Sequence, residues 1–433
     1  MEQACAGCGY RSVNRDFFRR EKSGIFRRKM AFCQGCAAYR PTRFERLSVD
    51  WAWMFITGAL LVASGRDQPL RGIGYLWVFF GAVALFAVVT TIVHELGHAI
   101  AAHLVGMKVV SVVVGSGPIL VARQWRDIRF ELHTYVLMGG MTAAYHQIES
   151  PAKWRQGAML LGGVGANLLL LMLGSGILIL LATRLALSNP FVMAAFAVLA
   201  SQIVAIIRDL WPHKLSGHQP ARPSDGRQLV DLFRAKDFPR RVQEGRLYWG
   251  GMALLLSGRN AAAQVHFEQA HRLLPANGTF FALLVHSASK AAGPQAALRY
   301  YLQHDGKLSS ENEVANAWLY RIVAWNAVLT HDPAMLPIAD ELSQRAIASL
   351  ATAPEAQGTR GAVLVEKGDV EQGLPLLMEG MRGVVGRGDK AGFATFLARG
   401  ERARGNSDLA DEFEKLARHL SALSGSKSHS TGT

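Results

Sequence analysis

Long apolar stretches alternate with polar segments in the first half of the chain. Apolar residues run from Leu47 to Ser64, from Tyr75 to Val93, from Gly157 to Thr183 and from Phe191 to Ile207. A helix needs about 20 apolar residues to cross the hydrocarbon core of a bilayer. The pattern therefore predicts a polytopic membrane protein with about four transmembrane helices.

Between the second and third stretches the pattern changes. Residues 107–148 include KVVSVVVGSGP and IRFELHTYVLMGG, which are rich in β-branched residues and interrupted by glycines. Such segments are typical of strands. We therefore expect a small β-hairpin region there.

From about residue 227 the chain has the composition of soluble helices. The segment GMALLLSGRNAAAQVHFEQAHRLLPAN places small and apolar residues at the positions of a tetratricopeptide helix pair, and Ala297 and Tyr301 repeat Ala263 and Phe267 at a spacing of 34 residues. The pattern predicts a soluble α-helical repeat domain. An ordinary helical bundle is the alternative.

The fold class is thus mainly α, with four segments. They are a cysteine-bearing head at 1–46, a transmembrane domain at 47–226, a helical domain at 227–422 and a disordered tail at 423–433.

Composition and charge agree with a membrane protein. Only 18% of residues are charged, against about 25% in soluble proteins. The net charge of +14 is distributed unevenly, since residues 1–50 carry eleven Lys and Arg whereas the segment between the third and fourth stretches carries only Arg184. The positive-inside rule then places both termini in the cytoplasm. We expect no nucleic-acid binding.

The head contains all four cysteines, as the pairs Cys5 with Cys8 and Cys33 with Cys36. Two CxxC knuckles suit a tetrahedral structural zinc ion, as in zinc ribbons. Redox pairs or disulfides are the alternative, which a reducing cytoplasm disfavours.

The candidate chemistry lies at 94–98, His-Glu-Leu-Gly-His, at the end of the second apolar stretch. On a helix, His94 and His98 share one face and can bind one metal ion, while Glu95 can take a proton from a water molecule. Ionisable residues at membrane depth indicate function. The pattern predicts a catalytic zinc site.

The third zinc ligand does not follow from this motif. The extended soluble-protease form needs a histidine at position 104, which is Leu104, and we interpret His103 as a packing or interfacial residue. Glu131 and Glu149 are downstream carboxylates that remain open as ligands.

Several segments together resemble the site-2 protease family of intramembrane zinc metalloproteases. They are HELGHAIAAHLVGMKVVSVVVGSGP, the glycine pair in MGGMTA, the small-residue helix GGVGANLLL and the Pro and Asp-Gly segment LWPHKLSGHQPARPSDGRQL. The resemblance covers residues 75–230 and implies a bacterial inner-membrane protein.

The resemblance also implies site residues. It makes Asp225 the third zinc ligand and Asn167 a polar residue of the active site. In this chain Asp209 stands at the family's Asn position, and Pro212 lies thirteen residues before Asp225. Asp209 therefore stays an alternative ligand.

The implied function is hydrolysis of a peptide bond in or near a transmembrane helix of a substrate protein, in regulated proteolysis. The substrate helix must unwind first, and residues 109–121 are a candidate strand for pairing with it. The helical domain would bind a cytoplasmic protein or peptide. A catalytically inactive scaffold is the main alternative, and a membrane metal transporter is a third.

Overall fold

The computed structural model describes residues 68–148, 152–185, 189–215, 222–304, 313–383 and 387–425, together with parts of the first 67 residues. The chain divides into two compact units. Residues 41–253 form one unit, and Met1–Arg40 with Leu254–Thr433 form the other. The domain boundaries expected from the sequence stay predictions.

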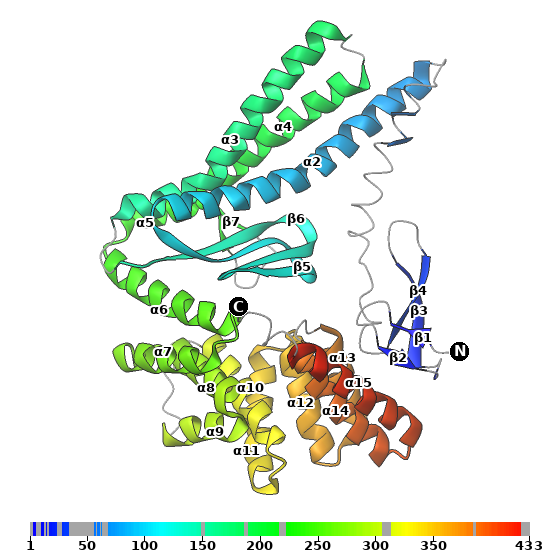
Figure 1. The fold of residues 1–433 in the computed structure, drawn as a ribbon, viewed down its shortest axis with the longest axis vertical. Helices are drawn as coiled ribbons and strands as arrows, with labels where there is room; N and C mark the ends of the chain where they lie inside the picture. Colours follow the sequence, from blue (N-terminus) through cyan, green and yellow to red (C-terminus); the bar gives the residue numbers. More distant parts are fainter. Residues whose placement is uncertain are drawn as a thin grey trace. The chain divides into compact units, whose positions relative to one another are not determined.

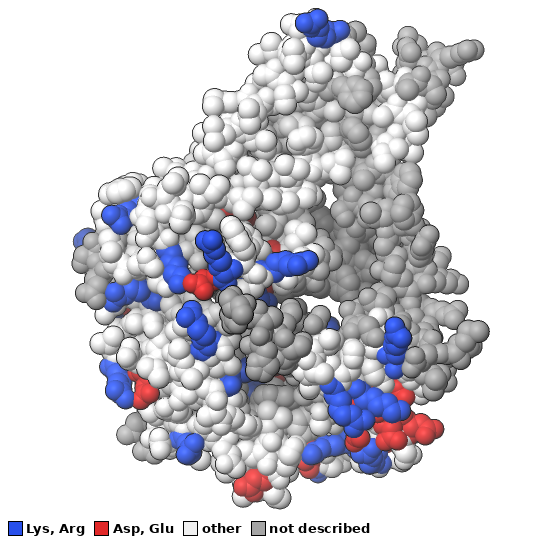
Figure 2. All heavy atoms as spheres, viewed as in Figure 1, with Lys and Arg blue, Asp and Glu red and all other residues white. Residues whose placement is uncertain are grey.

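Three long helices, α2 (Gln68–Leu104), α3 (Lys153–Arg184) and α4 (Pro190–Leu210), pack against one another (Figure 1). In the described part of the chain, α2 and α3 are long and apolar enough to cross a membrane. Large apolar side chains of α3 are exposed: Leu169, Met172, Leu173, Ile177, Ile179 and Leu180. The face of these helices seen in Figure 2 is nearly free of charged residues, as lipid contact requires.

These helices test the predicted spans in part. The stretches 75–93 and 157–183 lie in the two candidate spans. The stretch 191–207 is helix α4, whose role as a span stays a prediction, and 47–64 lies mostly outside the described residues.

Helices α2 and α3 touch through their backbones. A Cβ atom on Gly162 would lie 2.5 Å from both the Ala101 Cβ and the Gly97 carbonyl oxygen. Small residues at facing positions permit such an approach between membrane helices. The Gln202 amide of α4 also donates a hydrogen bond to the Thr90 hydroxyl of α2.

The predicted small β region is confirmed. Strand β5 (Met107–Trp125) pairs with β6 (Ile128–His146), and both are long enough to fold back on themselves. Residues 111–114 pair with 140–143 on one side and with 129–132 on the other. This part of the segment 109–121 is therefore closed to a substrate strand, contrary to our expectation. The end of β6 from Gly140 to His146 pairs, within the described residues, with β5 alone.

The Pro- and Gly-containing segment after α4 is folded on both sides of the undescribed residues 216–221. Strands β7 (Lys214–Leu215) and β8 (Arg222–Pro223) pair, and helix α5 (Asp225–Arg234) packs on α3 and α4. Helix α6 (Phe238–Leu256) follows. An apolar cluster joins α5 and α6 to the start of α3: Leu160, Leu232, Ala235, Phe238 and Val242.

The other unit is mostly helical. Its helices are α7 (Asn260–Leu273), α8 (Gly278–Ala292), α9 (Pro294–Gln303), α10 (Glu313–Leu329), α11 (Leu336–Ser349), α12 (Pro354–Glu366), α13 (Val370–Gly383), α14 (Arg387–Ala403) and α15 (Ser407–Gly425). Neighbours pack as pairs, and Ala263, Phe267 and Ala297 are fully buried. The helices agree with the expectation, while their assignment to tetratricopeptide repeats stays a prediction.

The N-terminal head packs on α15 within this unit. It contains β1 (Gln3–Ala4), β2 (Arg11–Ser12), β3 (Phe18–Ser23) and β4 (Arg28–Cys33). The Tyr10 hydroxyl donates a 2.8 Å hydrogen bond to the Glu412 carboxylate. Cys5 is buried, but Cys8 and Cys36 lie outside the described residues, so the second zinc site stays a prediction.

Candidate metal centre

Three donor atoms meet where α2 and α5 converge. His94 Nε2 and His98 Nε2 are 3.0 Å apart on successive turns of α2. Asp225 Oδ2, at the first turn of α5, lies 3.1 Å from His94 Nε2 and 3.2 Å from His98 Nε2. Among the described residues, this is the group of His, Cys, Asp or Glu side chains placed to hold a metal ion.

The donor set fits zinc. A tetrahedral zinc ion with bonds of about 2.0–2.1 Å holds its ligand atoms about 3.4 Å apart, and two imidazoles with one carboxylate are a common catalytic ligand set that leaves a fourth position open. The observed separations differ from this value by only a few tenths of an ångström. The centre therefore accepts a zinc ion with small side-chain shifts.

The start of α5 places Asp225. The Ser224 hydroxyl accepts a hydrogen bond from the Arg227 amide, which caps the helix. Gly226 touches the Leu210 carbonyl, so no larger residue fits there. Burial alone would raise the pKa of the Asp225 carboxyl, but its hydrogen bonds with His94 and His98 outweigh burial and lower that pKa below its usual range.

Both histidines are held from behind through Nδ1. His98 Nδ1 lies 2.8 Å from the Met159 carbonyl oxygen, and His94 Nδ1 lies 3.4 Å from Asp209 Oδ2. A hydrogen-bonded Nδ1–H fixes the tautomer that leaves Nε2 free for a metal. Asp209 thus lies behind His94 and outside the group of three donors.

Asn167 occupies the same position behind His94. Its amide nitrogen lies 3.1 Å from His94 Nδ1, while its oxygen is buried without a hydrogen-bond partner among the described residues. Oxygen and nitrogen of an amide exchange places on a rotation of 180°. We assign the rotated form, because the oxygen then accepts from His94 Nδ1–H and no buried acceptor is left over.

Glu95 points to the other side of the histidines, toward β6. Its side chain is buried, and its Oε2 accepts a 2.8 Å hydrogen bond from the Thr142 hydroxyl. A Cβ atom on Gly140 would lie 2.5 Å from Glu95 Cγ, so the glycine makes room for the carboxylate. A cavity of about 540 Å³ opens in front of His94, Glu95 and His98. It is large enough for a peptide segment.

The comparison with protein families agrees with this geometry. The sequence model of peptidase family M50 matches residues 80–363, about two thirds of the chain. The chain belongs to peptidase family M50. No curated protein matches the chain. Peptidases of family M50 are zinc-dependent, which at the family level makes this protein a membrane metallopeptidase.

The structure brings together His94, His98 and Asp225, places Glu95 beside them and puts Asn167 behind His94. Glu131 instead pairs with Arg129 and His133, and Glu149 is outside the described residues.

Sequence reasoning did not assign roles to Thr142 or Gly163. Their only signal is the small-residue composition of MGGMTA and GGVGANLLL.

Gly163 of α3 provides a steric test of the centre. A Cβ atom there would lie 2.5 Å from His98 Nε2 and 2.8 Å from His94 Nε2, in the space of the metal and its ligands. We expect Gly163→Ala to lower zinc affinity at least about tenfold, because a packed site cannot absorb a methyl group. Competition with a fluorescent zinc chelator measures this change.

Gly165→Ala is the matched control. Gly165 lies on the same helix as Gly163, and a Cβ atom there would meet nothing within 4 Å. Equal zinc affinities for the two variants would contradict the metal position inferred from the three donors.

Proposed function

We propose that this family M50 peptidase is an intramembrane zinc metalloendopeptidase that cleaves a membrane protein in or near its transmembrane segment, as a step of regulated proteolysis. The observation that supports the proposal is the convergence of His94, His98 and Asp225, with Glu95 beside them, in the last third of the apolar helix α2. Ionisable side chains within a membrane helix cost free energy, so their presence at this position indicates a function.

In this proposal His94, His98 and Asp225 hold the zinc ion. When bound there, zinc supplies a Lewis acid for the scissile carbonyl and lowers the pKa of a water molecule. Glu95 takes the proton of the attacking water as the new carbon–oxygen bond forms. It then gives the proton to the amide nitrogen as the carbon–nitrogen bond breaks.

Neighbouring side chains hold Glu95 and His94 in their orientations. The Thr142 hydrogen bond orients the Glu95 carboxylate, and Asn167 with Asp209 orients His94. The scissile segment must be extended, because a helix hides its carbonyl groups. We propose that it pairs with the end of β6 from Gly140 onward, which lines the cavity in front of Glu95.

The remaining parts have proposed roles as well. We propose four spans with both termini in the cytoplasm of a bacterial cell, a structural zinc ion on Cys5, Cys8, Cys33 and Cys36, and a helical array that binds a cytoplasmic protein or peptide. The distribution of Lys and Arg supports the orientation. Paired helices of the kind found in α7–α15 can present such a binding surface.

The test compares the membrane proteins of cells that express wild type or Glu95→Gln at equal levels. The variant keeps both histidines and Asp225 but lacks the proton acceptor. We expect a membrane-anchored precursor to accumulate in the variant and its cleaved product to appear with wild type, as measured by quantitative mass spectrometry of membrane peptides.

Re-expression of wild type in the variant cells should convert the precursor. Identical profiles under several stresses, with the variant present in the membrane at the wild-type level, would favour the inactive scaffold instead.

A further inference from the structure

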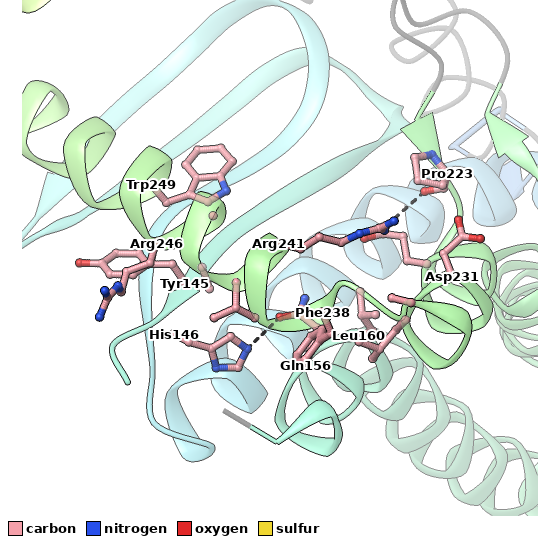
Figure 3. A pocket seen from close by; sticks show the side chains of 16 residues that line it. Tyr145, His146, Gln156, Leu160, Pro223, Asp231, Phe238, Arg241, Arg246 and Trp249 are labelled. Carbon is pink, nitrogen blue, oxygen red and sulfur yellow. Dashed lines mark hydrogen bonds between the residues drawn. The ribbon is translucent and has the colours of Figure 1, made fainter. Parts of the chain in front are cut away.

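A second cavity, of about 360 Å³, opens beside the metal cavity (Figure 3). Its volume is near the lower end of the range of about 300–1,000 Å³ for ligand pockets, and well above that of an ordinary packing gap. It lies between the end of β6, the first turns of α3, and helices α5 and α6.

The two cavities are continuous along one wall. They share Ala144, Gln156, Leu160, Pro223, Gln228 and Trp249. Thr142, which holds Glu95, is followed along β6 by Ala144, Tyr145 and His146, and these line the second cavity. A strand advances about 3.3 Å per residue. The second cavity therefore lies two to four residues along β6 from Thr142, the residue that binds Glu95.

The walls are mainly apolar, and the charged residues Asp231, Arg241 and Arg246 also line them. Phe238, Leu160 and Trp249 surround the space in Figure 3, while His146 is bonded to the Gln156 side chain at 3.1 Å. Burial lowers the pKa of His146, which favours its neutral imidazole. Two of these charged residues have partners outside the wall, since Arg241 pairs with Asp237 and Asp231 pairs with Arg227.

One glycine of α6 lines the cavity. Gly245 of α6 lies in its wall, and a Cβ atom there would meet no atom within 4 Å. A helix interior without a packing requirement disfavours glycine by about 1 kcal/mol relative to alanine. Gly245 therefore leaves room for a side chain that comes from elsewhere.

We infer that this cavity is a specificity subsite for one large apolar side chain of the substrate, such as Phe or Leu, located two to four residues from the scissile bond. The inference rests on the proposed function for the identity of the ligand. A substrate strand laid along β6 from Gly140 would deliver a side chain into this space, because the strand continues directly from the metal cavity into it. The preference is for size and apolarity, and it does not require a charge.

The experiment measures binding, so that it does not depend on hydrolysis. The full-length Glu95→Gln protein in detergent is titrated with a fluorescent peptide of about twenty Leu and Ala residues followed by a Ser and Gly tail. Single Phe residues are placed in turn at the first tail positions. Burying one Phe should tighten binding about tenfold at one or two positions and leave the others unchanged.

Filling the cavity should remove this preference. Adding Gly245→Leu should make the Phe peptide bind no tighter than the plain peptide, and Gly245→Ala should give a smaller loss. Gly176→Leu is the matched control, because a Cβ atom at Gly176 of α3 also meets nothing within 4 Å and lies outside both cavities. The control should keep the full preference.

Two results would overturn the subsite. One is a Phe residue without effect at every position, as expected if a lipid chain fills the cavity. The other is an undiminished preference in correctly folded Gly245→Leu. Failure of the proposed hydrolysis looks different, because the membrane proteins of wild-type and Glu95→Gln cells would then match whatever the peptide binding shows.

Discussion

Asp225→Ala is expected to remove one zinc ion per chain and to abolish hydrolysis, whereas Asp209→Ala should keep the ion with weaker affinity. Asp225 Oδ2 lies 3.1–3.2 Å from both imidazole Nε2 atoms, inside the coordination space. Asp209 Oδ2 lies 3.4 Å from His94 Nδ1, on the opposite side of that ring. Loss of a group that only orients a ligand costs about 10–100-fold in metal affinity, and loss of one of three ligands costs more.

The measurement is zinc content per chain of the purified full-length proteins, by elemental analysis after dialysis against a weak chelator. A difference of one equivalent between wild type and Asp225→Ala is the relevant quantity, because the head is proposed to hold a second ion. Circular dichroism checks that helices persist in both variants. Retention of the ion in Asp225→Ala and its loss in Asp209→Ala would reverse the assignment of the third ligand.

Glu95→Gln should lower the rate of peptide hydrolysis by about 10²–10⁴-fold while zinc content stays at the wild-type value. The side chain is buried and of the same size as glutamine, so the change removes proton transfer and little packing. An amide can still bind the Thr142 hydroxyl, which preserves the contact with β6. The assay uses purified protein in detergent with the membrane protein that accumulates in Glu95→Gln cells.

Thr142→Val provides the graded comparison. It leaves the carboxylate in place but removes its 2.8 Å hydrogen bond, so a smaller loss of about tenfold is expected. Wild-type activity in Glu95→Gln with zinc bound would rule out Glu95 as the base, and a loss in Thr142→Val as large as in Glu95→Gln would indicate a further role of the hydroxyl.

The helix that carries His94, Glu95 and His98 was predictable because the pattern that indicates it is local. A spacing of four residues places His94 and His98 on one face, and an uncharged apolar run of nineteen residues ends at Val93. The structure contains both features in α2. The resemblance to the site-2 proteases added Asp225 and Asn167, whose positions no periodicity relates to His94.

The expectation about strand pairing was wrong in part because strand partners are not local. The β-branched composition of residues 109–121 indicated a strand but did not indicate which edges are open. In the structure β5 is covered on both sides at 111–114, and the end of β6 lies along the metal cavity. The second cavity could not be predicted from the sequence. Gly245 lines it only because α6 packs beside β6, α3 and α5, and the sequence does not show that packing.

The sequence by itself determined a mainly helical membrane protein, the pair of imidazoles on one helix and the carboxylate next to them. These features depend on the length of an apolar run and on the helical period, and both are determined by residues that are close together in the sequence. The tertiary structure decided which carboxylate lies beside the two imidazoles, 131 residues from His94, and which of Asp209 and Asp225 lies behind the His94 ring. That choice depends on how α5 packs on α3 and α4, and so on contacts between segments that are distant in the chain.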